Sequence, residues 1–452
     1  MAEPGPALEQ LVDAVEAPTP TGIAAALSLL VRTGTWPPGT RLPTVRDVAA
    51  ALGVSPATVS HAWHGLAGAG VLVTRGRAGS YVRAADTAWL TPRYRDLAGY
   101  HSGFRLDLST GTPDPELLPD LTAVLARVAG HDLTGSYVET PVLPRLERHL
   151  RDTWPGPVEA VTVVDGAFDA MSRSLEAVVR YGDRVLVEDP CFPPLLDLLD
   201  ALGAEPVPVP LDDQGPDPAA LAAALDTSPV ALVLQPRAHN PTGLSLSDTR
   251  ARELGHLLER APDLVVVEDD HSGDVATAED VTLGRHLPGR VLHIRSFSKS
   301  HGPDLRIAAL GGPARLLDRI VARRMLGPGW TSRMLQRVLL ELLIGDTGMT
   351  AVAEARRVYH ARQQHLARAL AERGVDVEPG DGVNLWLPVV DEQSAIVRMA
   401  AAGIRVAAGE TFRSGGPCPD GLRGPHVRVT AGMVRGDFAQ VGAELADGAL
   451  AR

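Results

Sequence analysis

The sequence predicts an α/β protein in which a small N-terminal domain of short helices and two strands precedes a large domain with a mostly parallel central sheet. Its 452 residues are too many for one ordinary hydrophobic core. Short helical stretches closed by glycine occupy the first part, whereas apolar strand-like runs alternate with helical stretches beyond it. We therefore expect a small domain at residues 1–85, a linker at 86–104 and a large domain at 105–452.

The composition narrows the class of protein. Hydrophobic residues make up 45% of the chain and charged residues 22%, which is typical of a globular protein. No apolar run approaches the ~18 residues of a membrane span, and the first ten residues do not resemble a signal peptide. We expect a cytoplasmic protein that does not bind membranes. Cys191 and Cys418 are too few for a disulfide framework or a metal cluster, so we expect no metal.

Charge is divided unevenly along the chain. The formal net charge is −12, yet from Thr21 to Arg95 eight arginines stand against only two acidic residues. This segment is therefore about +6 on an otherwise acidic protein. Such segregation is typical of a small DNA-binding domain attached to an acidic body.

Three helices are predicted in the basic segment. Residues 22–34 carry apolar side chains at helical spacing, and two further helices follow at 44–53 and from Pro56 to about residue 68. Ser55 would cap the third helix, and Pro56 fits its first position because no N–H is needed there. The last two helices, joined through a glycine turn, form a helix-turn-helix.

The next segment predicts the wing of a winged DNA-binding domain. VLVTRGRAGSYVR predicts two strands around a basic turn, which would be the wing. A purely structural helical cap is the alternative, but PPGTRLPTVRDVAAALGVSPATVSHAWHGLAGAGVLVTRGRAGSYV closely resembles the GntR-type winged helix over about 45 residues. The resemblance implies a double-stranded DNA operator as partner. The predicted contacts are Thr44, Arg46, Ser55, Thr58, Ser60, His61, Arg75 and Arg77.

Polar clusters end four of the strands predicted in the large domain. The runs are RVLVEDPCF, VALVLQPRAHNPTG, LVVVEDDHSGD and VLHIRSFSKS. Ligands of open α/β sheets bind beyond the carboxyl ends of the strands, so these clusters should meet in one site. Lys299, in the last run, is the only lysine of the chain. An amine can lose its proton and attack a carbonyl, which a guanidinium cannot do.

The neighbours of Lys299 suit a phosphorylated pyridine. Asp269 can pair with a protonated ring nitrogen, Asn240 can donate to a phenolic oxygen, and Phe192 can stack on a ring. The remaining candidates would bind a phosphate through side chains or through the N-terminus of a helix. They are Ser296, Ser298, Arg306 and the backbone of Gly166, Ala167 and Phe168.

Together these motifs resemble the fold-type I aminotransferases over roughly residues 105–445. With the winged helix in front, the chain resembles the MocR-type subgroup of GntR regulators. The resemblance implies pyridoxal phosphate as cofactor, with Lys299 as the Schiff-base lysine and Asp269, Asn240 and Phe192 in the roles above. It also implies that Arg428, in HVRVT, binds the carboxylate of an amino acid. Tyr137 resembles the phosphate contact that a partner subunit donates, which implies a homodimer.

The sequence departs from the family at three positions and from one relative at a fourth. His271 stands where the family usually has tyrosine, Val142 lies near a usual glycine, and Glu147 replaces an arginine. If His271 faces the cofactor, we expect it to titrate between about pH 5.5 and 7.5; alternatively it turns away and a water replaces the phenol. Pro194 replaces the arginine with which one GABA-responsive relative binds its effector, so GABA is not expected here.

Three functions remain open on the sequence. We expect a dimeric regulator whose DNA affinity changes when an amine or amino acid reacts at the Lys299-bound cofactor. A working aminotransferase with an accessory winged helix is the alternative, because nearly all catalytic groups are present. A sensor of pyridoxal phosphate itself is the third.

Overall fold

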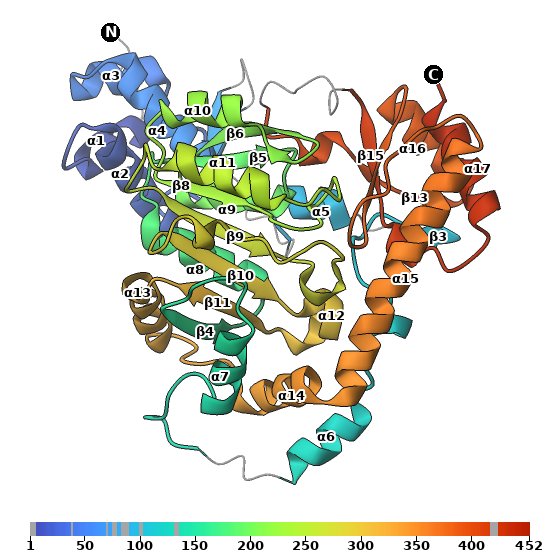
Figure 1. Cartoon of the computed structure of the whole chain (residues 1–452). Helices are drawn as coiled ribbons and strands as arrows, with labels where there is room; N and C mark the ends of the chain where they lie inside the picture. The colour runs from blue at the N-terminus through green and yellow to red at the C-terminus, as the bar shows by residue number, and fades with distance from the viewer. Residues whose placement is uncertain are drawn as a thin grey trace. The chain divides into compact units, whose positions relative to one another are not determined.

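The computed structural model describes residues 6–37, 39–68, 71–74, 79–82, 90–98, 103–130, 135–415 and 424–452. Two compact units emerge from the contacts (Figure 1). The first comprises Met1–Pro92 with Arg180–Gly182 and Asp197–Glu205, and the second comprises Arg93–Val179, Asp183–Leu196 and Pro206–Arg452. None of the described helices combines the length and the hydropathy needed to cross a bilayer.

The first unit contains the predicted winged helix-turn-helix. Its elements are α1 (Pro6–Ala14), α2 (Pro20–Arg32), α3 (Val45–Leu52), α4 (Pro56–Gly68), β1 (Leu72–Thr74) and β2 (Ser80–Val82). The strands pair antiparallel. All predicted helices and strands are present, whereas α1 was not predicted. Helix α3 is capped by Thr44, whose Oγ1 accepts from the Asp47 N–H, and Ser55 Oγ accepts from the Thr58 N–H over 3.2 Å.

An apolar stripe on α4 packs into the core of this unit. Val59, Ala62, Trp63 and Leu66 are buried at helical spacing, against a cluster that includes Ile23, Leu27, Trp36 and Val48. His61 and His64 lie on the exposed side of the same helix. The helix therefore has one face free to meet a partner.

The second unit is built on a sheet of eight strands. Their order is β4 (Ala160–Val164), β11 (Ala308–Gly312), β10 (Val291–Ser296), β9 (Val265–Asp270), β8 (Ala231–Leu234), β5 (Arg184–Asp189), β6 (Glu205–Asp212) and β7 (Gly215–Pro216). Strands β5, β8, β9 and β10 are parallel neighbours, and β11 runs antiparallel to β10 and β4. The four predicted runs are thus the four central parallel strands.

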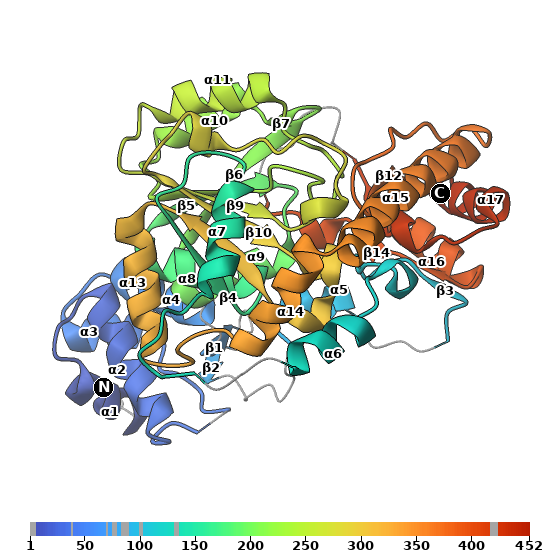
Figure 2. The same cartoon turned by 60° about the horizontal axis from the view of Figure 1, so that its bottom comes forward.

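Helices cover both faces of the sheet, as Figure 2 shows. On one face α10 (Pro218–Leu225) and α11 (Asp248–Leu258) bury leucines against β5, β8 and β9. On the other, α8 (Ala167–Val178) packs against β9, β10 and β11, and α13 (Ala314–Met325) packs against β4. The remaining helices before residue 345 are α5 (Pro92–Ala98), α6 (Thr122–Ala129), α7 (Pro144–Asp152), α9 (Pro193–Leu202), α12 (Ser298–His301) and α14 (Arg333–Ile344).

The C-terminal part of the second unit follows the long helix α15 (Asp346–Ala371). It has a three-stranded antiparallel sheet with the order β12 (Leu385–Pro388), β15 (His426–Val429) and β14 (Ala407–Ala408). Helices α16 (Glu392–Ala401) and α17 (Phe438–Ala449) cover it, and β3 (Leu106–Asp107) pairs with β13 (Ile404–Arg405). Short 3₁₀ turns occur at Pro115–Leu117, Gly273–Val275, Leu283–Arg285, Pro303–Leu305, Glu410–Phe412 and Ala431–Met433.

Candidate functional site

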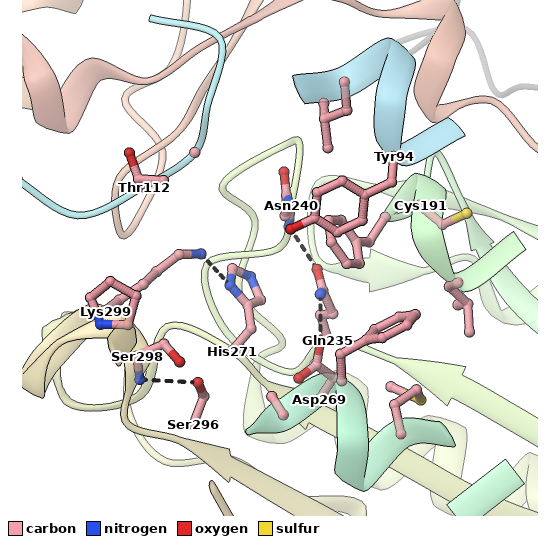
Figure 3. A pocket seen from close by; sticks show the side chains of 18 of the residues that line it. Tyr94, Thr112, Cys191, Gln235, Asn240, Asp269, His271, Ser296, Ser298 and Lys299 are labelled. Atoms are coloured by element: carbon pink, nitrogen blue, oxygen red, sulfur yellow. Dashed lines mark hydrogen bonds between the residues drawn. The ribbon is translucent and has the colours of Figure 1, made fainter. Parts of the chain in front are cut away.

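A cavity of about 550 Å³ lies where β5, β8, β9 and β10 end. This is the size of a typical small-molecule site. Every residue that the sequence analysis assigned to the cofactor or substrate, except Tyr137 and Gly166, lines it: Ala167, Phe168, Phe192, Asn240, Asp269, His271, Ser296, Ser298, Lys299, Arg306 and Arg428. Figure 3 labels ten residues of the wall, six of them from this set.

Lys299 lies on α12, directly after β10. Its Nζ is 2.5 Å from His271 Nδ1 (Figure 3). The pKa of this amine is lowered to about 7, mainly by burial and to a smaller extent by the charge of Arg428, against the opposing effect of Asp269. A large fraction of the amine is therefore neutral near pH 7, which is the form that attacks a carbonyl.

His271 faces the cavity rather than turning away. Its Nε2 lies 2.9 Å from the Ala238 carbonyl and must donate to it, so Nδ1 carries a lone pair that accepts from the Lys299 amine. Burial, and then the charge of Lys299, hold the pKa of the imidazole well below 6.5. The expected titration between about pH 5.5 and 7.5 is not supported, because a ring with so low a pKa stays neutral across that range.

Asp269, at the end of β9, presents one oxygen without a partner. Its Oδ2 accepts from Gln235 Nε2 over 2.9 Å, whereas Oδ1 is buried and has no hydrogen-bond partner among the described residues. Burial raises the pKa of this carboxyl to about 6. A buried, unpaired carboxylate oxygen at the base of a cavity is suited to a cationic N–H donor on a ligand.

Gln235 connects the two polar residues beside it and was missed by the sequence analysis. Besides donating to Asp269, it accepts from the backbone N–H of Asn240 through Oε1 over 2.8 Å, and its own N–H donates to the buried Glu188. These bonds are drawn in Figure 3 from Asn240 through Gln235 to Asp269. Its place as the polar residue directly after β8 was the signal that could have revealed it.

Arg428 enters the cavity from β15. It is 1% exposed, and its guanidinium donates to Asn240 Oδ1 over 3.0 Å and to the Ser109 carbonyl. Its Nε has no hydrogen-bond partner in the described part of the chain, and no ion pair with an acid is formed there. Burial lowers its pKa to about 9. A buried cation without a carboxylate is costly unless a ligand supplies one.

Asn240 has only its amide nitrogen left for a ligand. Its Oδ1 accepts from Arg428 and also from Asn384 Nδ2 over 3.3 Å. The NH₂ group therefore remains as a donor toward the cavity that Asn240 lines. This arrangement suits the predicted donation to a ring oxygen.

The start of α8 and Arg306 form a cradle at the cavity, which Ala167 and Arg306 line. Gly166 precedes the helix with φ +105°, and no side chain caps it. A Cβ on Gly166 would come within 2.5 Å of Arg306 Nη2, and that nitrogen donates to the Asp165 carbonyl over 3.1 Å. An uncapped helix N-terminus beside a guanidinium attracts an anion such as phosphate. Ser296 and Ser298 line the same cavity.

Two predicted aromatic rings and a set of residues that the sequence analysis did not assign complete the wall. Phe192 meets Phe168 edge-on, with ring centroids 6.2 Å apart. Tyr94 and Leu97 reach the cavity from α5, inside the segment predicted as a linker. The other unpredicted lining residues are Thr110, Gly111, Thr112, Pro113, Met171, Glu188, Cys191, Leu195, Val233, Gln235 and Pro303.

Tyr137 does not join the cavity of its own chain. Its side chain is 85% exposed, and its ring lies 5.9 Å from that of Trp330. The neighbouring Val138 is 92% exposed. The role predicted for Tyr137 at a partner's site stays a prediction.

The predicted DNA contacts that the structure describes lie at the start of α3 and at the start of α4. Arg46 and His61 are exposed, and Thr58 and Ser60 are half-buried on α4. Thr44 and Ser55 are the helix caps described above. Arg75 and Arg77 lie outside the described residues, as does Cys418.

Comparison with known families matches two parts of the chain. Residues 105–440 match the family described as aminotransferase class I and II. Residues 19–82 match the family described as bacterial regulatory proteins, gntR family. The first match covers well over half of the chain.

Two similar proteins that align over most of this chain are named as transcriptional regulators. The vitamin B6 salvage pathway transcriptional repressor PtsJ of Salmonella typhimurium is 37% identical, over 84% of this chain and 88% of its own length. The HTH-type transcriptional regulator TauR of Rhodobacter capsulatus is 28% identical, over 84% and 87%.

Similar solved structures include aminotransferases. A kynurenine aminotransferase of Pyrococcus horikoshii superposes with a TM-score of 0.70 at 21% identity, over 79% of this chain and 94% of its own. LysN, an α-aminoadipate aminotransferase of Thermus thermophilus, gives 0.69 at 23% identity, over 79% and 94%. At this identity the likeness establishes the fold of the second unit.

Proposed function

Because the chain belongs to the MocR-type subgroup of GntR-family transcriptional regulators, we propose that it binds pyridoxal phosphate at Lys299 and that an amine or amino acid bound there changes its affinity for DNA. The observation that carries this proposal is the cavity at Lys299. It combines a partly neutral amine with a buried carboxylate oxygen that lacks a partner.

The side chains that line the cavity have the chemical groups that pyridoxal phosphate would need. Asp269 Oδ1 needs a donor, which a protonated pyridine nitrogen supplies, and the uncapped start of α8 with Arg306 suits the phosphate. Phe192 would stack on the ring, and the Asn240 amide would donate to the ring oxygen. Pyridoxal phosphate would supply a carbonyl for an amine and a ring that withdraws electrons.

The chain's own groups then have separate tasks. Lys299 supplies the attacking amine. His271, which burial keeps neutral, accepts a hydrogen bond at Nδ1. Gln235 holds Asp269 and the Asn240 backbone in fixed positions. The guanidinium of Arg428 would bind a carboxylate, so we infer that the effector has a free carboxyl group, as an amino acid does.

The effector could instead be the cofactor itself. This second candidate is favoured by the Salmonella relative, whose name connects it with vitamin B6 salvage. The two candidates differ in which addition changes DNA affinity: pyridoxal phosphate alone, or an amino acid added to the loaded protein.

The test measures binding of the loaded and unloaded full-length chain to labelled fragments of its genomic DNA. Pyridoxal phosphate is added first, followed by a panel of amino acids and amines. We expect colour from covalent uptake of the cofactor and a change in DNA affinity with an amino acid. If the affinity for DNA stays the same after every addition, the proposal is contradicted. New amino acid formed from 2-oxoglutarate or pyruvate at about 1 per second or faster would favour the aminotransferase alternative.

A homodimer is part of this proposal. The exposure of Tyr137 and Val138 supports it, because large apolar side chains so open to solvent are common at interfaces. In the dimer Tyr137 would contact the phosphate in the partner's cavity.

A further inference from the structure

We propose that α5 is part of the ligand site, and that Tyr94 and Leu97 on this helix respond to its occupancy and pass the response to the winged helix along the chain. This inference rests on the proposed function, because the ligand is the one that the Lys299 cavity binds. It adds a sensing element that is distinct from the residues that hold the cofactor.

The position of α5 gives it this opportunity. The N-terminal segment of the first unit ends at Pro92, which is also the first residue of α5, so the helix follows that segment directly in the sequence. Tyr94 and Leu97 are three residues apart, which places them on the same side of a helix. Both line the cavity. Figure 3 shows the Tyr94 ring reaching into it on the side of Asn240 and Cys191.

Leu97 packs α5 against side chains that lie next to the proposed ligand-binding residues. It is 7% exposed and belongs to an apolar cluster with Trp386, Ala407 and Phe412, against which Phe192 also packs. The Phe412 ring lies 5.0 Å from the guanidinium carbon of Arg428. The cluster therefore includes the proposed ring-stacking residue and the ring beneath the proposed carboxylate-binding residue.

Because α5 has only seven residues, its stability should respond to whether the cavity is occupied. Helices this short are unstable in isolation, so α5 depends on what its apolar side packs against. A ligand that adds contacts to Tyr94 or steadies the Leu97 cluster should stabilise the helix. By thermodynamic reciprocity, weakening the docking of α5 should then weaken ligand binding by the same factor.

Hydrogen–deuterium exchange of the full-length chain tests the first half of this argument. The probe is pyridoxal 5′-phosphate, and uptake is followed separately by its absorbance. We expect amides of α5 to exchange more slowly in the loaded protein. Uptake without any change in α5 would overturn the inference and leave the proposed function standing. A protein that takes up no pyridoxal phosphate would overturn both.

Variants test the second half. Tyr94→Ala and Leu97→Ala should each lower the affinity for pyridoxal 5′-phosphate by about 5-fold or more and reduce the protection of α5. Leu225→Ala on α10 is the matched control, because Leu225 is 8% exposed and packs in a different cluster. It should lose fold stability but keep wild-type affinity. Wild-type affinity in both α5 variants, or an equal loss in the control, would overturn the inference.

Discussion

The Lys299 amine lies 2.5 Å from Nδ1 of His271, and the other ring nitrogen of His271 faces the Ala238 carbonyl at 2.9 Å. The backbone carbonyl thus fixes which nitrogen carries the proton, and the lone pair of the imidazole points at the amine. A tyrosine at this position would offer a hydroxyl donor in its place. His271 therefore gives this cavity an acceptor beside its nucleophile.

The rate of cofactor capture should depend on pH through Lys299. Its pKa of about 7 means that half of the amine is neutral near pH 7. The rate measured by absorbance should rise through about pH 7 and level off about one to two pH units above it, without a further rise at the usual lysine pKa of about 10.4. A separate step from His271 is not expected, since its ring is already neutral.

Substitution of Lys299 provides the matching control. Lys299→Ala should stay folded and lose the borohydride-reducible link to the cofactor, and Lys299→Arg should lose it as well, because arginine does not deprotonate. A reducible link that survives in either variant would show that the chain uses another group.

Asp269 should make the unfolding free energy of the unloaded protein depend on pH. Its pKa is raised by burial from 3.8 to about 6, so between these values the folded state binds the proton more tightly than the unfolded state. The contribution of Asp269 should therefore fall as pH rises through this window, by on the order of 3 kcal/mol. Denaturant titrations of wild type and Asp269→Asn measure it as their difference. Parallel pH profiles would contradict the raised pKa.

Arg428→Ala should separate ligands by their carboxyl group. Since the guanidinium is buried without an acid to pair with, its removal breaks no ion pair within the described chain. The loaded variant should lose about 2–4 kcal/mol in amino-acid affinity, whereas simple amines should be less affected. Calorimetry with matched pairs of an amino acid and its decarboxylated amine measures the contrast. Equal losses for both members of each pair would make Arg428 a structural residue.

Substitutions in the first unit should change DNA binding in two different ways. Arg46→Ala should weaken binding to all sequences and reduce the log–log salt slope by about one unit, and Arg75→Ala and Arg77→Ala should do the same. His61→Ala should instead change the preferred sequence. Arg260→Ala is the control, because this exposed arginine pairs with Asp226 in the second unit. Its salt slope should match that of wild type, and an equally reduced slope would point to net charge alone.

Mixed dimers can test Tyr137. If it contacts the phosphate in the partner's cavity, Tyr137→Ala should weaken cofactor binding although the side chain lies outside its own cavity. A Tyr137→Ala protomer mixed with a Lys299→Ala protomer should regain one intact site per heterodimer. Absence of any recovery in heterodimers that form stably would place Tyr137 outside the site.

The sequence was most informative where local chemistry repeats along the chain. Apolar runs followed by polar clusters identified four parallel strands and hence the cavity, and glycine and serine signals located α3 and α4. It was least informative where tertiary packing decides. The segment that forms α5 is short and lacks a clear helical pattern, and the low pKa of His271 arises from burial that no neighbouring residue reveals. Gln235 matters only because folding places Asp269 and Asn240 on either side of it.

The place of α5 also bears on the construction of hybrid biosensors. A designer who joins a foreign DNA-reading module to this body would naturally cut where the matched aminotransferase region begins, at residue 105. That junction would discard Tyr94 and Leu97 and remove part of the cavity wall. A fusion point before Pro92 keeps α5 with the cavity that it lines. A foreign DNA-binding domain joined there would therefore be attached to a complete ligand site.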